Sequence, residues 1–284
     1  MSDKEDKLVS PCTYQGGKQR VAGEIWTSIA ARQPIKEDVV IYDLCCGSGA
    51  VTIEGLNRGI KPEQIVMCDK SSWGAFWKSV GDGTFDIIKF KEYSQKVPRD
   101  KSKVQGYMKE LSRTNADEDE VYKYILLQAS SFGGKQIWKE GNVWKNTSFR
   151  NYWQPTETSN RKSPVNPMQP GIEEIEKRVE RLVEKCKGLT CYNVDIWNML
   201  DMIRDDVCDK IIYIDPPYAA TTGYGFTFDY KEFIKELKKV TDVVIYVSEK
   251  EKLTEGAIQL AFSGKKGGIS GVRKGKNEEW LNIY

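Results

Sequence analysis

Histidine is absent from all 284 residues of the chain. A protein without imidazole has no histidine general base and no Ser-His nucleophile, and it lacks the commonest zinc ligand. The seven cysteines contain no CxxC pair and are scattered along the chain like small apolar residues in a reducing compartment. We therefore expect no metal site, and any catalysis must use other side chains or the main chain.

Long apolar runs are missing as well, and none approaches the length of a membrane span. The first seven residues are too polar for a secretion signal, so we expect a cytoplasmic protein that does not contact a membrane. A net charge of +2 is almost neutral, which means that any anion binding must come from local patches. The length suits one large domain, or one domain with a sizeable insertion.

The most informative stretch is Asp215-Pro216-Pro217-Tyr218, which follows a short apolar run at 210–214 typical of a buried parallel strand. Ligands of open α/β sheets bind where such strands end. The Asp215 carboxylate and the Pro216 carbonyl can each accept a hydrogen bond from an exocyclic amino group, and Tyr218 offers a flat face for stacking. The alternative is an Asp-Pro turn that merely ends a strand.

A second strand is predicted at 39–43, and a turn containing Gly47 and Gly49 connects it to a helix through residue 57. Strand, glycine-rich turn and helix open a nucleotide-binding βαβ unit, in which glycine lets the backbone approach the ligand. Thr52 stands where the third glycine of a dinucleotide fingerprint belongs. The acid that ends this strand, Asp43, suits a cofactor with an amino group better than one with a pyrophosphate.

The next predicted strand, 64–69, ends in Asp69, twenty residues after Gly49. A carboxylate at this place can accept hydrogen bonds from both hydroxyls of an adenosine ribose, and an exposed loop aspartate is the alternative. A later strand, 189–194, is followed by Asp195 and Ile196. They could hold the amino group and the edge of a cofactor adenine, or Asp195 could be a plain helix cap.

Near the N-terminus, Tyr14, Gly16, Gly17 and Lys18 precede a helix predicted at 19–31. Glycines and a lysine ahead of a helix can hold an anion through main-chain N–H groups and the helix dipole. A flexible loop that enters a helix is the alternative. Helices are also predicted at 171–187 and 229–239, and a strand at 242–248. Segments 258–262 and 279–284 are predicted to close the sheet as an antiparallel pair.

The α/β alternation is lost between residues 70 and 170, where 17 Lys and Arg face 11 Asp and Glu among many aromatic residues. Basic and aromatic residues together suit a nucleic-acid surface. The alternative is a small helical subdomain with a solvated basic face. The cations that we expect to contact DNA are Lys135, Lys139, Lys145 and Arg150, with Lys265 and Lys266 from a glycine-rich loop near the C-terminus.

Residues 13–18, the turn at 43–49, Asp69 and the tetrapeptide 215–218 occur in one order and at compatible spacing. This arrangement resembles the Dam-like, D12 class alpha-group of DNA adenine-N6 methyltransferases, and the likeness spans nearly the whole chain. Two departures are Tyr14, where many members carry tryptophan, and Leu44-Cys45-Cys46, where a Pro-Phe or similar pair is usual.

The resemblance implies an α/β, Rossmann-like sheet that binds S-adenosylmethionine and methylates the exocyclic amino nitrogen of adenine in double-stranded DNA. The catalytic domain would comprise residues 1–69 and 171–284, and residues 70–170 would form an inserted, mainly helical target-recognition subdomain. The family's cofactor roles would fall on Tyr14, Lys18, Asp43, Asp69 and Asp195, and its catalytic roles on Asp215, Pro216 and Tyr218.

The chemistry of the tetrapeptide agrees with this resemblance. An aryl amine is a poor nucleophile because its lone pair is delocalised into the ring. Hydrogen bonds to Asp215 and Pro216 would draw the lone pair onto nitrogen, so no strong base is needed before transfer. A base inside a duplex must be flipped out to reach such a pocket. Methylation of cytosine or of RNA, and an inactive DNA-binding relative, remain alternatives, and the oligomeric state is open.

Overall fold

The computed structural model describes residues 7–217, 228–260 and 278–284 of the chain. Its helices are α1 (Ala22–Ala30), α2 (Ala50–Asn57), α3 (Ser72–Gly81), α4 (Ile87–Gln95), α5 (Lys101–Leu111), α6 (Glu120–Ser130), α7 (Ile172–Lys185), α8 (Met199–Asp205) and α9 (Tyr230–Val240), with short 3-10 turns η1 (Pro62–Gln64), η2 (Phe132–Gly134) and η3 (Ile196–Asn198). Its strands are β1 (Val40–Leu44), β2 (Ile65–Cys68), β3 (Trp138–Glu140), β4 (Val143–Lys145), β5 (Thr190–Tyr192), β6 (Lys210–Ile214), β7 (Ile245–Glu249), β8 (Ile258–Gln259) and β9 (Trp280–Ile283).

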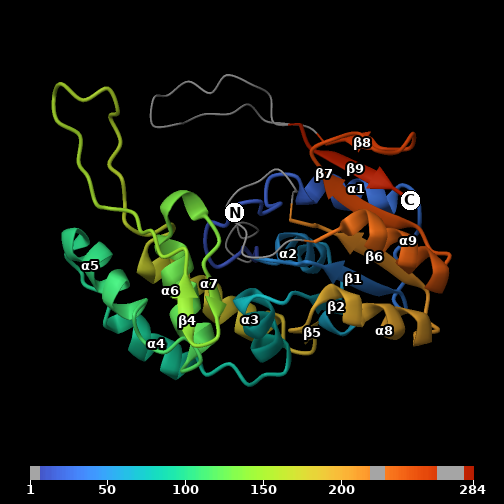
Figure 1. Cartoon of the computed structure of the whole chain (residues 1–284), viewed down its shortest axis with the longest axis horizontal. Coiled ribbons are helices and arrows are strands. Elements are labelled where there is room, and N and C mark those ends of the chain that lie inside the picture. The colour runs from blue at the N-terminus through green and yellow to red at the C-terminus, as the bar shows by residue number, and fades with distance from the viewer. Residues whose placement is uncertain (1–6, 218–227, 261–277) are drawn as a thin grey trace.

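Seven of the described strands form one sheet in the order β5-β2-β1-β6-β7-β9-β8. The first five are parallel, whereas β9 runs antiparallel to both β7 and β8 (Figure 1). The mainly parallel α/β sheet and its closing antiparallel pair are therefore confirmed. Since β9 is reversed, its beginning lies at the same edge of the sheet as the carboxyl ends of the parallel strands.

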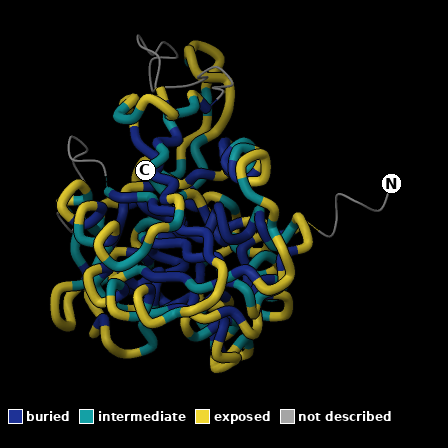
Figure 2. Tube along the Cα trace, turned by 90° about the vertical axis from the view of Figure 1, so that its right-hand side faces the viewer, coloured by how far each residue is buried: buried dark blue, intermediate teal, exposed yellow. Residues whose placement is uncertain are grey.

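Both faces of the sheet are covered, as the apolar strands require. Side chains alternate along each strand. Ile41 and Ile211 pack on one face with residues of α1, α2 and α3, and Tyr42 and Ile212 pack on the other with residues of α8 and α9. In Figure 2 the strands at the centre are dark blue and exposed yellow residues lie on the loops around them. This burial on both faces fixes the strand ends on which the site is built.

The segment 70–170 contains α3 to α6 and the separate hairpin β3-β4. Its first helix, α3, packs against β5 and β2, and α4 and α5 extend away from the sheet (Figure 1). The aromatic residues Trp73, Phe76, Trp77 and Phe90 are fully buried and belong to the core that also covers the sheet. Core packing rather than surface chemistry therefore accounts for these four rings.

Most element boundaries fall within a few residues of those expected. The strand expected at 242–248 begins at Ile245, where the main chain pairs with Tyr284, and its register with β6 matches Ile245 to Ile212. The helix expected at 19–31 is shorter, from Ala22 to Ala30. No described helix combines the length and the apolar character that crossing a membrane would require.

Candidate active site

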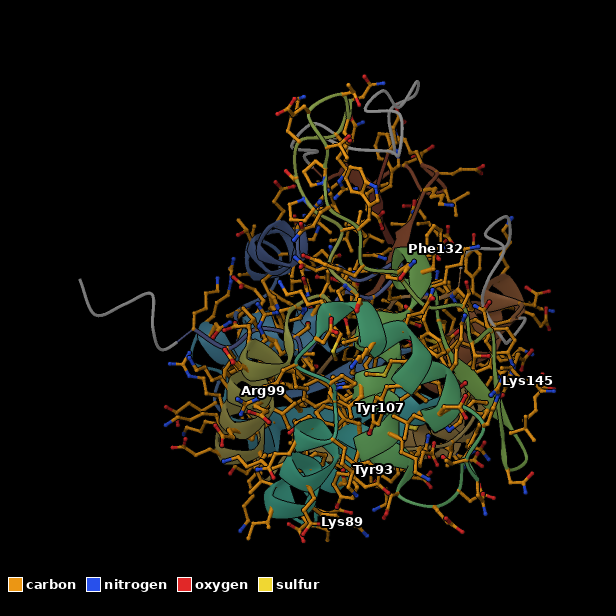
Figure 3. All side chains as sticks on the ribbon, turned by 90° about the vertical axis from the view of Figure 1, so that its left-hand side faces the viewer. Lys89, Tyr93, Arg99, Tyr107, Phe132 and Lys145 are labelled. Atoms are coloured by element: carbon orange, nitrogen blue, oxygen red, sulfur yellow. The ribbon has the colours of Figure 1, made fainter. Side chains whose placement is uncertain are left out.

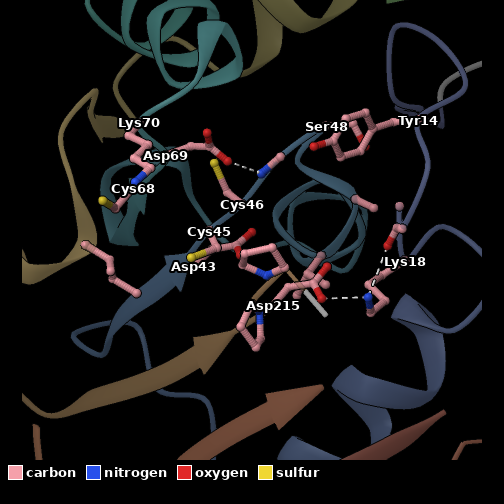
Figure 4. Close-up of a pocket in the computed structure, with 18 of the residues that line it drawn as sticks. Tyr14, Lys18, Asp43, Cys45, Cys46, Ser48, Cys68, Asp69, Lys70 and Asp215 are labelled. Carbon is pink, nitrogen blue, oxygen red and sulfur yellow. Dashed lines mark hydrogen bonds and ion pairs between the residues drawn. The ribbon is translucent and has the colours of Figure 1, made fainter. Parts of the chain in front are cut away.

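A pocket lies at the carboxyl edge of the sheet, beyond the ends of β1, β2 and β6 (Figure 4). The empty space within it amounts to about 860 Å³, a figure that includes space open to solvent. Eleven residues expected at the site line it: Tyr14, Gly16, Gly17, Lys18, Asp43, Gly47, Asp69, Asp195, Ile196, Asp215 and Pro216. Gly49 lies behind the lining, and Tyr218 is outside the described residues.

The glycine-rich turn after β1 is held by an aromatic residue of α3. The Trp77 indole N–H donates to the Gly47 carbonyl at 3.0 Å. Gly49 has φ +70°, and a Cβ at this position would lie 2.3 Å from the Trp77 ring. Glycine is required at position 49 for both reasons. Cys45, in the same turn, has φ +61°, a conformation that is uncommon for a residue with a side chain.

Asp43, at the end of β1, is buried, and both of its hydrogen bonds come from Thr52 of α2. The Thr52 hydroxyl donates to Asp43 Oδ2 at 2.7 Å, and the Thr52 main-chain N–H donates to the same oxygen at 3.2 Å. Burial raises the pKa of Asp43 to about 6, and the two bonds from Thr52 work in the opposite direction. Thr52, which stands where the third glycine of a dinucleotide fingerprint belongs, therefore orients the Asp43 carboxylate through these two hydrogen bonds.

Asp69, after β2, is bonded to neutral donors through both carboxylate oxygens. Oδ2 accepts the Gly47 N–H at 2.8 Å, and Oδ1 accepts the N–H and the hydroxyl of Ser71 at 2.8 and 2.6 Å. The side chain is therefore held at the pocket wall next to the glycine turn (Figure 4). The position suits the ribose role that the sequence predicts, and that role stays a prediction.

Asp195 has the cap function that was the alternative for it, and it also lines the pocket. Its Oδ1 accepts the Trp197 N–H at 3.2 Å at the start of η3, and its Oδ2 pairs with Lys70 at 3.0 Å. Ile196 is buried beside it. These two residues form the wall of the pocket next to β5, and their contact with the adenine of a cofactor stays a prediction.

Lys18 lines the pocket and forms ion pairs with two acids, and its cofactor role stays a prediction. Its ammonium group lies 2.6 Å from Asp215 Oδ1 (Figure 4). It also lies 3.4 Å from Glu279 Oε1 and donates to the Gly16 carbonyl at 3.0 Å. The Lys18 side chain is only 5% exposed. Burial lowers the pKa of Lys18, but the two carboxylates outweigh burial and raise it, so the side chain is a fixed cation.

Asp215 follows β6 directly, and its N–H donates to the Leu44 carbonyl of β1. Burial raises the pKa of Asp215 to about 7, and the adjacent Lys18 ammonium is the main influence that lowers it. The carboxylate therefore depends on Lys18 to be ionised near neutral pH. The ion pair with Lys18 is made through Asp215 Oδ1.

Several residues of the pocket region were not predicted from the sequence, among them Glu279, Gln136 and Ser48. Glu279 precedes β9, and only the reversal of that strand brings it to the site. Gln136 lies between η2 and β3 and lines the pocket from the 70–170 segment. Ser48 lies in the glycine turn, and its buried hydroxyl has no hydrogen-bond partner among the described residues.

The cations expected to contact DNA have different surroundings. Lys135 is exposed, and Lys145 lies on the outer face of the 70–170 segment, 3.6 Å from Glu140 (Figure 3). Lys139 is paired with both Asp117 and Glu120, and Arg150 is only 7% exposed. Lys265 and Lys266 lie outside the described residues. A DNA contact by any of these residues stays a prediction.

Taken together, a mainly parallel sheet, a glycine turn and acids at successive strand ends define an α/β enzyme of the nucleoside-cofactor class. The family model for the D12 class N6 adenine-specific DNA methyltransferases matches residues 14–253, and the chain belongs to this family. It is an enzyme that transfers a methyl group from S-adenosylmethionine to N6 of adenine in DNA. No curated protein gives a match to the chain. Glu279 lies beyond the matched residues.

Proposed function

We propose that methyl transfer takes place in the pocket at the carboxyl edge, with the cofactor against β1, β2 and β5 and the adenine against β6. The observation that carries this proposal is the ion pair between Lys18 and Asp215, which fixes a partly buried carboxylate in the same pocket as Asp43 and Asp69. One pocket thus contains acceptors for both reactants.

The residues present fit S-adenosylmethionine, which methyltransferases of this family use. Asp43 and Asp69 are acceptors suited to its amino group and ribose hydroxyls, and Asp195 with Ile196 suits its adenine. The orphaned Ser48 hydroxyl supplies a further polar contact in the turn. When bound, the cofactor supplies an electrophilic methyl group on a positively charged sulfur.

Asp215 and Pro216 would then hold the amino group of adenine. Asp215 Oδ2 and the Pro216 carbonyl accept its two hydrogens, which turns the nitrogen lone pair out of the ring plane toward the methyl group. The amino nitrogen would accept the methyl group, the cofactor would leave as a neutral thioether, and the nitrogen would release its proton to solvent. Asp215 is an acceptor that orients the nitrogen throughout, and no base stronger than a carboxylate is required.

The substrate would be double-stranded DNA from which the target adenine is flipped into the pocket, because N6 inside a duplex cannot reach Asp215. Tyr218 is proposed to stack on the flipped base. Residues 70–170 are proposed to read the target, since they carry an excess of positive charge and place Gln136 at the pocket. Residues 1–69 and 171–284 would form the catalytic domain.

The test is transfer of a labelled methyl group to double-stranded DNA by Asp215→Ala. We expect a loss of about a thousandfold or more in rate, as for removal of a group that orients and stabilises the transition state. Cofactor affinity, measured by calorimetry, should change little. The matched control is Asp209→Ala, because Asp209 precedes the same strand but its side chain is 67% exposed. Asp209→Ala should retain the wild-type rate.

Undiminished transfer by Asp215→Ala would contradict the proposed role of Asp215. Nucleoside analysis of the product checks the flipped-base arrangement against other acceptors. Methyladenine formed in duplex DNA supports it, whereas faster transfer to single-stranded nucleic acid at every concentration would contradict recognition of a duplex. A solution fluorescence assay with 2-aminopurine at the target position reports flipping directly, because an unstacked base becomes brighter.

A further inference from the structure

Glu279 is a buried acid that no step above uses. It stands immediately before β9, and Trp280 pairs with Glu249 at the end of β7. The reversed direction of β9 therefore places Glu279 at the carboxyl edge of the sheet, beside Lys18. Its side chain is 11% exposed, and its carboxylate lies 3.4 Å from the Lys18 ammonium. A buried charge at this place is costly unless it is paired, so its presence needs an explanation.

The net charge of the cluster formed by Lys18, Asp215 and Glu279 explains why a buried acid stands at this place. Lys18 and Asp215 alone make a neutral pair, and a neutral pair attracts the positive charge that develops on the amino nitrogen only weakly. With Glu279 the cluster contains one ammonium and two carboxylates, and its net charge is −1 when all three are ionised. We propose that Glu279 is a positioning residue for methyl transfer: by sharing Lys18, it leaves Asp215 with the negative charge that holds and stabilises the amino group.

This inference rests on the proposed function of Asp215 and adds a role for its neighbour. Lys18 and Glu279 have opposite effects on Asp215, since the ammonium lowers the pKa of Asp215 and Glu279 raises it. The other groups that face this cluster are Asp43 of β1, Tyr213 of β6, Cys45 of the glycine turn and Glu249 of β7. Lys18 and Glu279 therefore act on Asp215 in opposite directions, and each of the two can be removed separately by mutation.

The experiment measures the rate of methyl transfer to duplex DNA as a function of pH for the wild type and Glu279→Gln. Loss of Glu279 should lower the rate at its high-pH plateau by about tenfold, as expected for removal of one electrostatic contribution. It should also move the acidic limb of the profile to lower pH by roughly one unit, because a like charge next to Asp215 is gone. Glu278→Gln, which alters the exposed neighbouring residue, is the matched control and should change neither quantity.

A second comparison uses Lys18→Met. Without the ammonium, Asp215 and Glu279 repel each other, and the acidic limb should move above its wild-type position. Adding Glu279→Gln to Lys18→Met should then raise the rate near neutral pH by several-fold, although the same change lowers the plateau rate when Lys18 is present. Glu279→Asp, which keeps the charge, should retain most of the wild-type rate and the wild-type limb.

The inference is supported if Glu279→Gln lowers the rate of methyl transfer in the wild type and raises it in Lys18→Met. Equal fractional losses in both backgrounds, or a loss of rate by Glu279→Gln without movement of the limb, would overturn it and leave Glu279 with a structural role. Circular dichroism and the unfolding temperature of each variant show whether it folds. The two proposals fail differently: if Asp215→Ala retains the wild-type rate, the role of Asp215 is wrong, whereas active Glu279→Gln with an unchanged profile contradicts only the role of Glu279.

Discussion

The two halves of the pocket stabilise their acids by different means. In the half that we propose to bind the cofactor, the cofactor half, Asp43 and Asp69 accept hydrogen bonds from the neutral groups of Thr52, Gly47 and Ser71. In the half that we propose to hold the adenine, the catalytic half, Asp215 and Glu279 are paired with the buried ammonium of Lys18. Neutral donors orient a carboxylate without cancelling its charge, whereas an ammonium both orients it and cancels it.

This difference matches the two tasks proposed for the halves. A cofactor that presents hydroxyls and an amino group is bound by acceptors whose geometry is fixed before it arrives. The amino nitrogen of adenine gains charge only during the reaction, so its acceptor must remain ionised while buried. The contrast predicts that mutations in the cofactor half act on cofactor affinity and stability, and that those in the catalytic half act on the rate and its pH dependence.

The largest effect in the cofactor half is expected from Gly49→Ala. The new Cβ would lie 2.3 Å from the Trp77 ring at φ +70°, so steric overlap is added to backbone strain. We expect a loss of about 3 kcal/mol in the free energy of unfolding, from overpacking and a left-handed conformation together. Chemical denaturation measures it.

Gly133→Ala is the matched control for this variant. Gly133 has φ +69°, and a Cβ there would meet no atom within 4 Å. It isolates the backbone strain, for which we expect about 1 kcal/mol. Equal losses for the two variants would mean that the contact with Trp77 does not restrict the turn.

Asp69→Asn should have the next largest effect. An amide has one acceptor oxygen instead of two, so it cannot accept from Gly47 on one side and Ser71 on the other. We expect cofactor affinity to fall by about 30-fold, which corresponds to roughly 2 kcal/mol for hydrogen bonds to a charged group. Calorimetry with the cofactor measures this change.

The rate of Asp69→Asn at saturating cofactor should stay within a few-fold of the wild type, because the catalytic half is intact. Asp86→Asn is a suitable control, since Asp86, the N-cap of α4, also accepts hydrogen bonds from main-chain N–H groups but does not line the pocket. A large loss of rate at saturation with unchanged affinity would contradict the division of the pocket into two halves.

The sequence predicted one half of the pocket better than the other, for a physical reason. Asp43, Asp69 and Asp215 each follow an apolar strand run, and parallel strands bring such ends to one edge without any further information. Glu279 precedes its strand instead, so its place depends on β9 running antiparallel to β7. The sequence predicted that 258–262 and 279–284 pair with each other in antiparallel fashion, but not which strand of the parallel sheet they join. The partner of Lys18 is likewise 197 positions away in the chain.

The surroundings of the aromatic residues of 70–170 were not predicted from the sequence. Composition suggested a surface for nucleic acid, but Trp73, Phe76 and Trp77 are fully buried on the face of the sheet. Helical spacing in α3 is compatible with either role, and only the packing of α3 against β5 distinguishes them. The helical character of this segment could therefore be predicted from the sequence, whereas the burial of its aromatic side chains could not.

The smallest effect is expected from Thr52→Val. It should appear mainly in the pH dependence of cofactor affinity. Burial raises the pKa of Asp43 to about 6, and the bonds from Thr52 lower it, so their loss should raise the pKa further. In the wild type, Asp43 loses its negative charge as the pH falls through about 6, and cofactor affinity should decline there. In Thr52→Val the decline should begin at a higher pH, closer to neutrality, with affinity at pH 8 reduced only about threefold.

Calorimetry between pH 5 and 8.5 measures both curves, and Thr27→Val, which removes an exposed hydroxyl of α1 that donates to Gly23, should reproduce the wild-type curve. We assign the acidic limb of the transfer rate to Asp215, whose pKa burial raises to about 7, and we expect this limb not to move in Thr52→Val. A shift of that limb together with the binding curve would show that Asp43 and Asp215 titrate as one unit. The neutral donors of the cofactor half and the ammonium of the catalytic half would then control a single shared charge.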